Sequence, residues 1–374
     1  MKKEFYYHLP TEIYFGEGQI KRLSRIAGKR HRVMLVCGRG FLRKSGWLQK
    51  IKTLLKGNKV LIFDGVYENP DVELVETGLS LARKNRIDLV IGVGGGSVLD
   101  CAKAIAALVP NKGQVITFLE KKRTLTRPGL RFIAVPTTAG SASEVTPYSV
   151  ITVPQRGIKV TLAHKYLYPE VAVIDPVFLK SLSRSQIANP GIDVLCHAIE
   201  SYWSVSNNPI SDAFAIEAVK LVFENLKGFY RNRHSKLFRI NMARASLFAG
   251  LAFSNTRTTA CHSISYPLTT IYRIPHGQAC AVTLPEVLIY NEKALKVKME
   301  SLKNIVGAED VAKVAHQIRN LILDIGLKIR LRDLNLKESD LLTVLAKGFT
   351  PERMANNPRK ISRGAMRAIL KKVY

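Results

Sequence analysis

Four side chains in the second half of the sequence could together bind a metal ion. Asp193 and His197 are four residues apart, a spacing that places both side chains on one face of a helix. His262 and His276 follow, the latter within an Ile-Pro-His-Gly run at 274–277. One carboxylate and three imidazoles suit Fe²⁺ or Zn²⁺, which could polarise a substrate oxygen, and suit Ca²⁺ or Mg²⁺ poorly. Taken singly, each histidine is more typical of an ordinary surface or core residue, so the hypothesis depends on the combination.

Two loops in the first half have the composition of a nucleotide-binding site. The run Gly94–Ser97 follows a short apolar segment and opens an amphipathic stretch. Glycines let backbone N–H groups approach a pyrophosphate, and a helix N-terminus favours its negative charge. A tight strand-to-helix turn would use glycine as well. A second loop of small and hydroxyl residues at 136–146 also follows an apolar segment, and the two loops together predict one cofactor site.

The elements that must position these groups fall into two unlike parts. Up to about Pro176, short β-branched runs alternate with amphipathic stretches, which predicts a mostly parallel, Rossmann-like α/β sheet. The expected strands lie at 32–37, 60–63, 89–93, 132–135 and 171–174. Beyond Leu179 the pattern is helical, with long segments at 210–226, 240–253 and 311–325. We therefore expect a dinucleotide-binding α/β domain at 1–178 and an all-α metal-binding domain at 179–374.

Length and cysteine usage restrict the class of protein. With 374 residues, 47% of them hydrophobic, the chain can form two packed domains. Neither a signal peptide nor an apolar run of membrane-spanning length is present, so we expect no membrane partner. The five cysteines are odd in number and lack a Cys-x-x-Cys pair, which indicates free thiols and a cytoplasmic location.

The formal net charge of +28 is unusual for an enzyme. Such a charge attracts phosphorylated cofactors, acidic substrates and, without specificity, nucleic acid. Lysines and arginines are spread along the whole chain rather than gathered in a tract with aromatic residues, so we expect no dedicated nucleic-acid binding. A basic proteome or a hot or salt-rich habitat would also explain the charge. A non-catalytic protein that binds polyanions is the alternative from another functional class.

Together these motifs resemble the iron-containing (group III) alcohol dehydrogenases. The motifs that carry the resemblance are 15–18, 94–103, 136–146, 191–200, 274–277 and 357–359, so it covers nearly the full chain. The resemblance implies a dehydroquinate synthase-like fold whose active site lies in the cleft between the two domains. It also implies hydride transfer between NAD(P)H and a small aldehyde or alcohol, and a homodimer or larger homo-oligomer. A glycerol dehydrogenase-like polyol oxidoreductase is the alternative within the superfamily, although those enzymes generally use zinc and fewer protein ligands.

The resemblance also assigns roles to individual residues. Asp193, His197, His262 and His276 fall on the metal-ligand positions, with iron expected and zinc as the alternative. Arg39 stands near the place of the acidic residue of NAD-preferring relatives and could pair with a 2′-phosphate, so we expect NADP(H) to be preferred over NAD(H). Arg39 could also be one more solvated cation. The predicted cofactor-binding residues are Arg39, Asn69, Gly95, Gly96, Ser97, Thr137, Thr138, Ser141 and Lys159.

Tyr266 is the predicted catalytic residue and the point at which the chain departs from the family pattern. Many members carry a second histidine four residues after the His262 position, where it suits proton relay near neutral pH. Tyr266 could instead donate the proton, contact the substrate or only pack. The residues around it resemble the branch that contains phosphonoacetaldehyde reductases, which makes anionic phosphonoacetaldehyde a candidate substrate.

Overall fold

The structure, a computed structural model, describes residues 4–374 and divides into two compact units. The α/β unit comprises residues 9–138 and 142–179. The helical unit comprises residues 4–8, 139–141 and 180–374. None of the helices in the described residues is long and apolar enough to cross a membrane.

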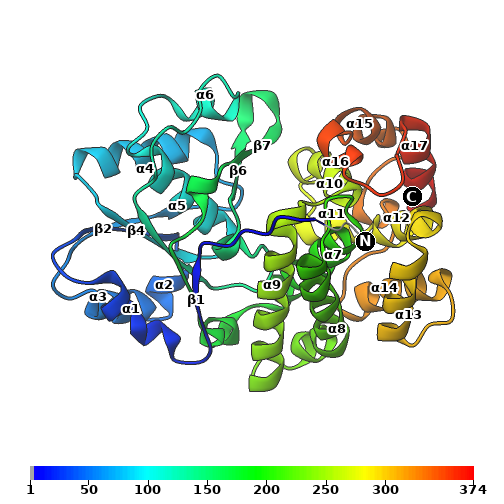
Figure 1. Cartoon of the computed structure of the whole chain (residues 1–374), viewed down its shortest axis with the longest axis horizontal. Coiled ribbons are helices and arrows are strands. Elements are labelled where there is room, and N and C mark those ends of the chain that lie inside the picture. The colour runs from blue at the N-terminus through cyan, green and yellow to red at the C-terminus, as the bar shows by residue number, and fades with distance from the viewer. Residues whose placement is uncertain (1–3) are drawn as a thin grey trace. The chain divides into compact units, whose positions relative to one another are not determined.

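A six-stranded parallel sheet forms the centre of the α/β unit (Figure 1). Its order is β1 (Glu12–Phe15), β8 (Val171–Ile174), β5 (Arg131–Pro136), β4 (Leu89–Gly94), β2 (Arg32–Gly38) and β3 (Lys59–Val66). All five strands expected from the sequence are in this sheet, and the predicted fold class is confirmed. The short edge strand β1 and the antiparallel hairpin of β6 (Tyr148–Val153) and β7 (Ile158–Ala163) are not among the strands expected from the sequence.

Helices cover both faces of the sheet because each central strand is apolar on both sides. In β2, Val33 and Leu35 join one hydrophobic core, whereas Met34 and Val36 join the other, as expected for side chains that alternate along a strand. The first core includes α1 (Leu23–Ala27) and α3 (Trp47–Leu54), next to α2 (Phe41–Lys44). The second includes α4 (Val72–Lys84), α5 (Gly96–Leu108) and α6 (Val115–Leu119). The sheet is therefore doubly wound.

The strand order reverses beside β2, which pairs with β3 on one side and β4 on the other. In open parallel sheets, ligands bind outside the carboxyl ends of the strands at such a reversal. Here the loop after β2 contains Arg39 and the loop after β4 contains Gly95. The topology thus places two of the predicted cofactor loops at neighbouring strand ends.

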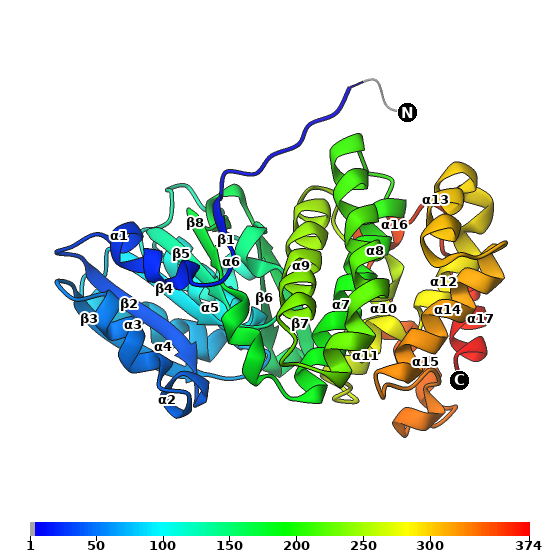
Figure 2. The same cartoon turned by 90° about the horizontal axis from the view of Figure 1, so that it is seen from below.

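Helices alone build the remainder of the described chain. They are α7 (Arg184–Trp203), α8 (Pro209–Arg231), α9 (Lys236–Thr256), α10 (Ala260–Thr270), α11 (His276–Ala281), α12 (Leu284–Asn291), α13 (Lys296–Val306), α14 (Val311–Asp324), α15 (Asp340–Lys347), α16 (Pro351–Ala355) and α17 (Arg363–Lys372). Figure 2 shows α7, α8 and α9 side by side, and they pack against one another. Ser183 and Gln186 form a capping box that begins α7, which is buried from Gly191 to its end.

Candidate metal centre

Helix α7 places Asp193 and His197 one turn apart in the interior of the helical unit. Both side chains are buried, and the His197 Nδ1 lies 3.8 Å from an Asp193 carboxylate oxygen. Helix α11 approaches α7 closely because Gly277 has no side chain: a Cβ there would lie 1.9 Å from the Asn189 backbone oxygen. This close packing brings the first residue of α11, His276, toward Asp193.

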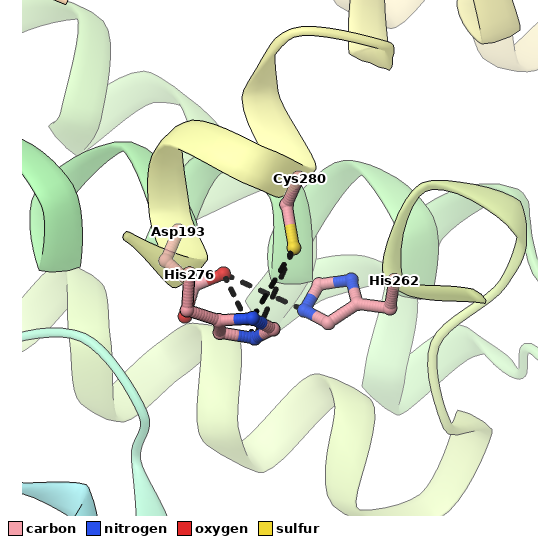
Figure 3. A group of neighbouring side chains, drawn as sticks. All are labelled: Asp193, His262, His276 and Cys280. Carbon is pink, nitrogen blue, oxygen red and sulfur yellow. Dashed lines mark hydrogen bonds and ion pairs between the residues drawn. The ribbon is translucent and has the colours of Figure 1, made fainter. Parts of the chain in front are cut away.

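Four donor atoms from three helices converge at this place (Figure 3). Asp193, His262, His276 and Cys280 each offer one ligand atom, and all four atoms lie within 4.8 Å of one another. Asp193 Oδ1 is 3.5 Å from His262 Nε2 and 4.0 Å from His276 Nε2. Tetrahedral donors around a zinc-sized ion, at bond lengths of about 2.0–2.3 Å, stand roughly 3.3–3.8 Å apart. The observed separations are therefore close to those of a metal site.

The hydrogen-bonding state of the cluster fits a cation at its centre. In the part of the chain that the structure describes, Asp193 Oδ1, His197 Nδ1 and His262 Nε2 are buried without a hydrogen-bond partner. Buried polar atoms are nearly always paired, since leaving one unsatisfied costs free energy. Carboxylate, imidazole and thiol donors favour a borderline or soft divalent ion over Mg²⁺ or Ca²⁺. A bound ion of this kind would satisfy the unpaired atoms.

His197 lies beside this cluster, and Cys280 lies within it. The His197 ring stacks on Phe253 at 4.2 Å and on His262 at 4.5 Å between ring centroids. Burial is the main cause that lowers the pKa of His197 to about 4, so its imidazole is neutral at pH 7. The Cys280 Sγ lies 3.8 Å from His276 Nε2, one helical turn along α11. The four-residue spacing that singled out Asp193 and His197 would also have singled out Cys280.

The neighbouring histidines influence the ionisation of Asp193. Burial by itself would raise the pKa of Asp193, but His197, His276 and His262 lower it well below the usual range. Burial by itself would lower the pKa of His262, but Cys280, Glu200 and Asp193 raise it well above the usual value. The site thus keeps a buried carboxylate ionised.

Glu200 is a buried residue of the site that has no role in the sequence-based prediction. One of its carboxylate oxygens accepts a hydrogen bond from His262 Nδ1. The other accepts bonds from Thr259 Oγ1 at 2.7 Å and from the Cys261 backbone N–H at 2.8 Å. Burial opposes ionisation, but His262 and these donors together lower the pKa of Glu200. The bond to Nδ1 directs Nε2 of His262 toward Asp193, as outer carboxylates do for metal-binding histidines.

Tyr266 lies one turn beyond His262 on α10 and is paired with an arginine. Its hydroxyl accepts a hydrogen bond from Arg353, whose guanidinium carbon lies 4.9 Å from the centre of the tyrosine ring. Arg353 belongs to the short helix α16 and also donates to Thr258 Oγ1, just before α10. No sequence pattern links Arg353 with Tyr266, because 87 residues separate them.

Most of the predicted cofactor residues lie together at the carboxyl edge of the sheet. Gly95 precedes α5 without a side-chain cap, so the first N–H groups of this helix are open to an anion. A Cβ at Gly95 would lie 3.2 Å from Thr138 Oγ1 and would fill the space between the two loops. The Thr137 N–H donates to the Gly94 oxygen at 3.0 Å, and the Asn69 N–H donates to Ser97 Oγ at 3.1 Å. Gly96 is the first residue of α5. These residues fit a pyrophosphate.

The three remaining predicted cofactor residues lie on other segments. Arg39 donates to the Gly65 oxygen at 3.3 Å, and its guanidinium carbon lies 5.0 Å from the centre of the Tyr67 ring. Lys159 is the second residue of β7, near the turn of the β6–β7 hairpin and opposite Thr152. Ser141 belongs to the segment 139–141, which is part of the helical unit.

Lys103 and Asp100, which are also part of the glycine-loop motif, connect α5 to the following loop. The Lys103 ammonium is buried and donates to the backbone oxygens of Ser143, Thr146 and Tyr148 at 2.7–2.9 Å. Asp100 accepts a bond from Ser143 Oγ at 2.6 Å. Burial lowers the pKa of Lys103 to about 8. These contacts hold the second loop against the helix that begins at the first.

A doubly wound sheet with an open, glycine-rich helix start, together with a buried acid–histidine cluster, is the combination that a metal-dependent nicotinamide dehydrogenase requires. Comparison with known proteins agrees. The profile of iron-containing alcohol dehydrogenase matches residues 10–176, and that of the C-terminal domain of the same family matches residues 187–374. The chain belongs to the iron-containing alcohol dehydrogenase family and is an oxidoreductase, as the sequence predicts.

Similar proteins match over nearly their full lengths. A 1,3-propanediol dehydrogenase of Citrobacter freundii is 35% identical, with 95% of each chain covered. An NADPH-dependent butanol dehydrogenase of Clostridium saccharobutylicum is 33% identical, covering 98% of this chain and 97% of the other. Among solved structures, a sulfoacetaldehyde reductase of Bifidobacterium kashiwanohense in complex with NAD⁺ has a TM-score of 0.93 at 34% identity, covering 99% of this chain and 98% of that one.

Proposed function

We propose that this protein reduces a small, negatively charged aldehyde with NADPH at a divalent metal site in its helical unit. The observation that carries the proposal is the set of buried, unpaired donor atoms on Asp193, His197 and His262. A bound metal supplies Lewis-acid polarisation of a carbonyl oxygen, and the nicotinamide supplies the hydride. The protein's own residues then have to hold both groups, exclude water and deliver a proton.

The proposed ligands are Asp193, His197, His262 and His276, with Fe²⁺ as the ion and Zn²⁺ as the alternative. His197 is neutral and unpaired at Nδ1, which suits a ligand, although Cys280 is the fourth member of the tightest cluster. Metal content after anaerobic refilling of His197→Ala and Cys280→Ser distinguishes the two sets. We expect His197→Ala to lose most of its metal and Cys280→Ser to retain it. The opposite result would replace His197 by Cys280 in the ligand set.

The cofactor proposal depends on the loops at the strand reversal in the α/β unit. The open start of α5 and the gap between Gly95 and Thr138 support a pyrophosphate there. Arg39, at the end of the neighbouring strand, supports a preference for NADPH because a guanidinium pairs with a 2′-phosphate. Arg39→Asp should raise KM for NADPH at least tenfold and leave KM for NADH unchanged or lower. Arg25→Asp, an equal charge change at an exposed arginine, is the control. An unchanged NADPH KM in Arg39→Asp would refute the role.

Tyr266 is proposed as a substrate-contacting residue. It stands one turn from His262, and its hydroxyl already accepts a bond from Arg353. This arrangement leaves the Tyr266 hydroxyl hydrogen available to a neighbouring oxygen. Tyr266→Phe should therefore lower kcat/KM while metal content stays unchanged. If kcat/KM also stays unchanged, the tyrosine only packs.

The proposed substrate class is a short aldehyde with an acidic head group, with phosphonoacetaldehyde as the candidate from sequence. The similarity to a sulfoacetaldehyde reductase supports a closely related anion. Turnover measurements with NADPH would test this substrate class, using phosphonoacetaldehyde, sulfoacetaldehyde, propanal and butanal. Higher kcat/KM for the uncharged aldehydes would contradict the proposal.

Location and assembly are also proposed. Five buried, free cysteines support a reducing compartment such as the cytoplasm. The family resemblance supports a homodimer or larger homo-oligomer. Light scattering of the purified protein would measure the assembly, and a monomeric mass would contradict it.

A further inference from the structure

Arg353 is a half-buried cation that has only neutral partners. Its guanidinium donates to the hydroxyls of Thr258 and Tyr266, and among residues 4–374 no aspartate or glutamate forms an ion pair with it. Half-buried charges normally pair, because removal from water penalises an isolated charge. Arg319, in the same unit, shows the usual arrangement and pairs with Glu286. The charge of Arg353 is therefore held in place without being neutralised.

The segment that holds Arg353 is also connected to the metal cluster. Two consecutive threonines make the links. Thr258 accepts a hydrogen bond from Arg353, and Thr259 donates one to Glu200. Glu200 in turn accepts a hydrogen bond from His262. The backbone just before them is strained, since Arg257 has φ 62° and ψ 177°. A non-glycine residue in that region costs about 1–3 kcal/mol and persists where the surrounding structure requires it. The strained turn sets both threonines in place.

The hydrogen-bond partner of Arg353 also lies close to the cluster. Tyr266, its hydrogen-bond partner, follows His262 by one helical turn, so their Cβ atoms are about 5–6 Å apart. A molecule bound at the cluster could thus reach the guanidinium with a second group one turn away.

The chemistry of the guanidinium specifies that second group. Arginine has five N–H donors in a planar fork, of which Thr258 and Tyr266 take two, so three are left. Such a fork binds tetrahedral oxyanions and carboxylates through paired, charge-assisted hydrogen bonds. An aldehyde with the anionic group one carbon from the carbonyl carbon would place its two polar ends at neighbouring positions.

We infer that Arg353, positioned by Thr258 and Tyr266, binds the sulfonate or phosphonate group of the aldehyde substrate. This inference rests on the proposed reductase function and names the residue that selects its substrate class. In this arrangement Tyr266 orients the arginine and lines the same site. Many family members have a histidine at this position, and the tyrosine of this chain then serves substrate selection rather than proton relay.

Steady-state kinetics of the metal-loaded enzyme with NADPH test the inference. The substrates are sulfoacetaldehyde, phosphonoacetaldehyde and uncharged propanal. Arg353→Met should lower kcat/KM for the preferred anionic aldehyde at least 100-fold, mainly through a higher KM. It should change kcat/KM for propanal less than threefold. Arg353→Lys keeps the charge without the fork and should give an intermediate loss. The ratio of wild-type kcat/KM values for the two anions identifies the sulfonate or the phosphonate.

The control is Arg359→Met, because Arg359 also lies over a tyrosine ring, that of Tyr290 at 4.1 Å, yet has no contact with the Thr258–Tyr266 pair. It should behave as wild type with all three aldehydes. Ethanesulfonate and methylphosphonate, which cannot be reduced, provide a second measurement with the wild-type protein. We expect the analogue of the preferred substrate to inhibit competitively against that aldehyde, and Arg353→Met to raise its inhibition constant at least tenfold.

The outcomes separate this inference from the proposed function. If propanal is reduced but Arg353→Met leaves the anionic aldehydes unaffected, the inference is wrong and the reductase function stands. Absence of inhibition by both analogues in the wild-type protein would also overturn it. If the loaded wild-type enzyme reduces none of the three aldehydes, the proposed function fails and the inference fails with it.

Discussion

Glu200 offers a sharp test of the metal centre because it acts on the site without entering it. Glu200→Gln keeps the shape of the side chain and removes its charge. The fully buried carboxylate accepts three hydrogen bonds, one of them from His262 Nδ1. In the variant, His262 would donate to a neutral amide oxygen, and its Nε2 would become a weaker donor toward a metal. The amide nitrogen would then face both Thr259 and Cys261, which donate hydrogen bonds to the same oxygen of the native carboxylate.

The expected loss of metal affinity follows from these contacts. Removing an outer carboxylate from a metal-binding histidine typically weakens affinity about 10–100-fold, or about 1.4–2.7 kcal/mol. We expect the upper half of this range, because the amide removes the acceptor that two of the three native donors share in the interior. Thr259→Val removes one neutral donor and keeps the charge, so its effect should stay below about tenfold.

Competition between the apoprotein and a chelator, under anaerobic conditions with Fe²⁺ and separately with Zn²⁺, measures these affinities. Glu286→Gln serves as the control, since Glu286 is a half-buried carboxylate of the same unit that pairs with Arg319. Its metal affinity should equal that of the wild type. Equal affinities for Glu200→Gln and wild type, with both folded by circular dichroism, would refute the idea that Glu200 tunes a metal ligand.

Two further predictions concern packing and pH. Gly277→Ala should destabilise the protein by about 3 kcal/mol or more and reduce its metal content. The new Cβ would meet the Asn189 backbone oxygen at 1.9 Å, and moving the backbone away costs free energy. A urea titration measures the stability of this variant and of the control Gly364→Ala, where the nearest atom is 3.7 Å from the new Cβ. The control should be neutral or slightly stabilising. Equal effects of the two substitutions would contradict the packing argument. Burial raises the pKa of Glu144 from 4.5 to about 7, so the native state loses stability as pH rises through that interval. Glu144→Gln should therefore be nearly neutral at pH 4.5 and more stable than wild type by up to about 3 kcal/mol at pH 8, and a pH-independent difference would show that Glu144 ionises freely.

Much of the fold follows from local patterns in the sequence. The strands at 32–37 and 89–93 were predictable because β-branched residues in short apolar runs can only be buried on both faces of a sheet. In the long helices of the second half, apolar residues recur at helical spacing, so these helices were equally predictable. Residues 12–15 gave no such signal, since a four-residue edge strand with one face partly exposed has almost no pattern.

The sequence by itself placed Asp193 and His197 on one helical face, because that relation depends only on the pitch of a helix. Only the tertiary structure decided which donors meet: it added Cys280 to the cluster, gave Glu200 to His262, and set Arg353 against Tyr266 across 87 residues of chain. Such contacts are fixed by how helices pack, as where Gly277 of α11 meets Asn189 of α7. Packing depends on the shapes of surfaces far apart in sequence. The spacing of residues in the sequence therefore predicts a metal site, whereas the packing of the helices determines which charged groups surround it.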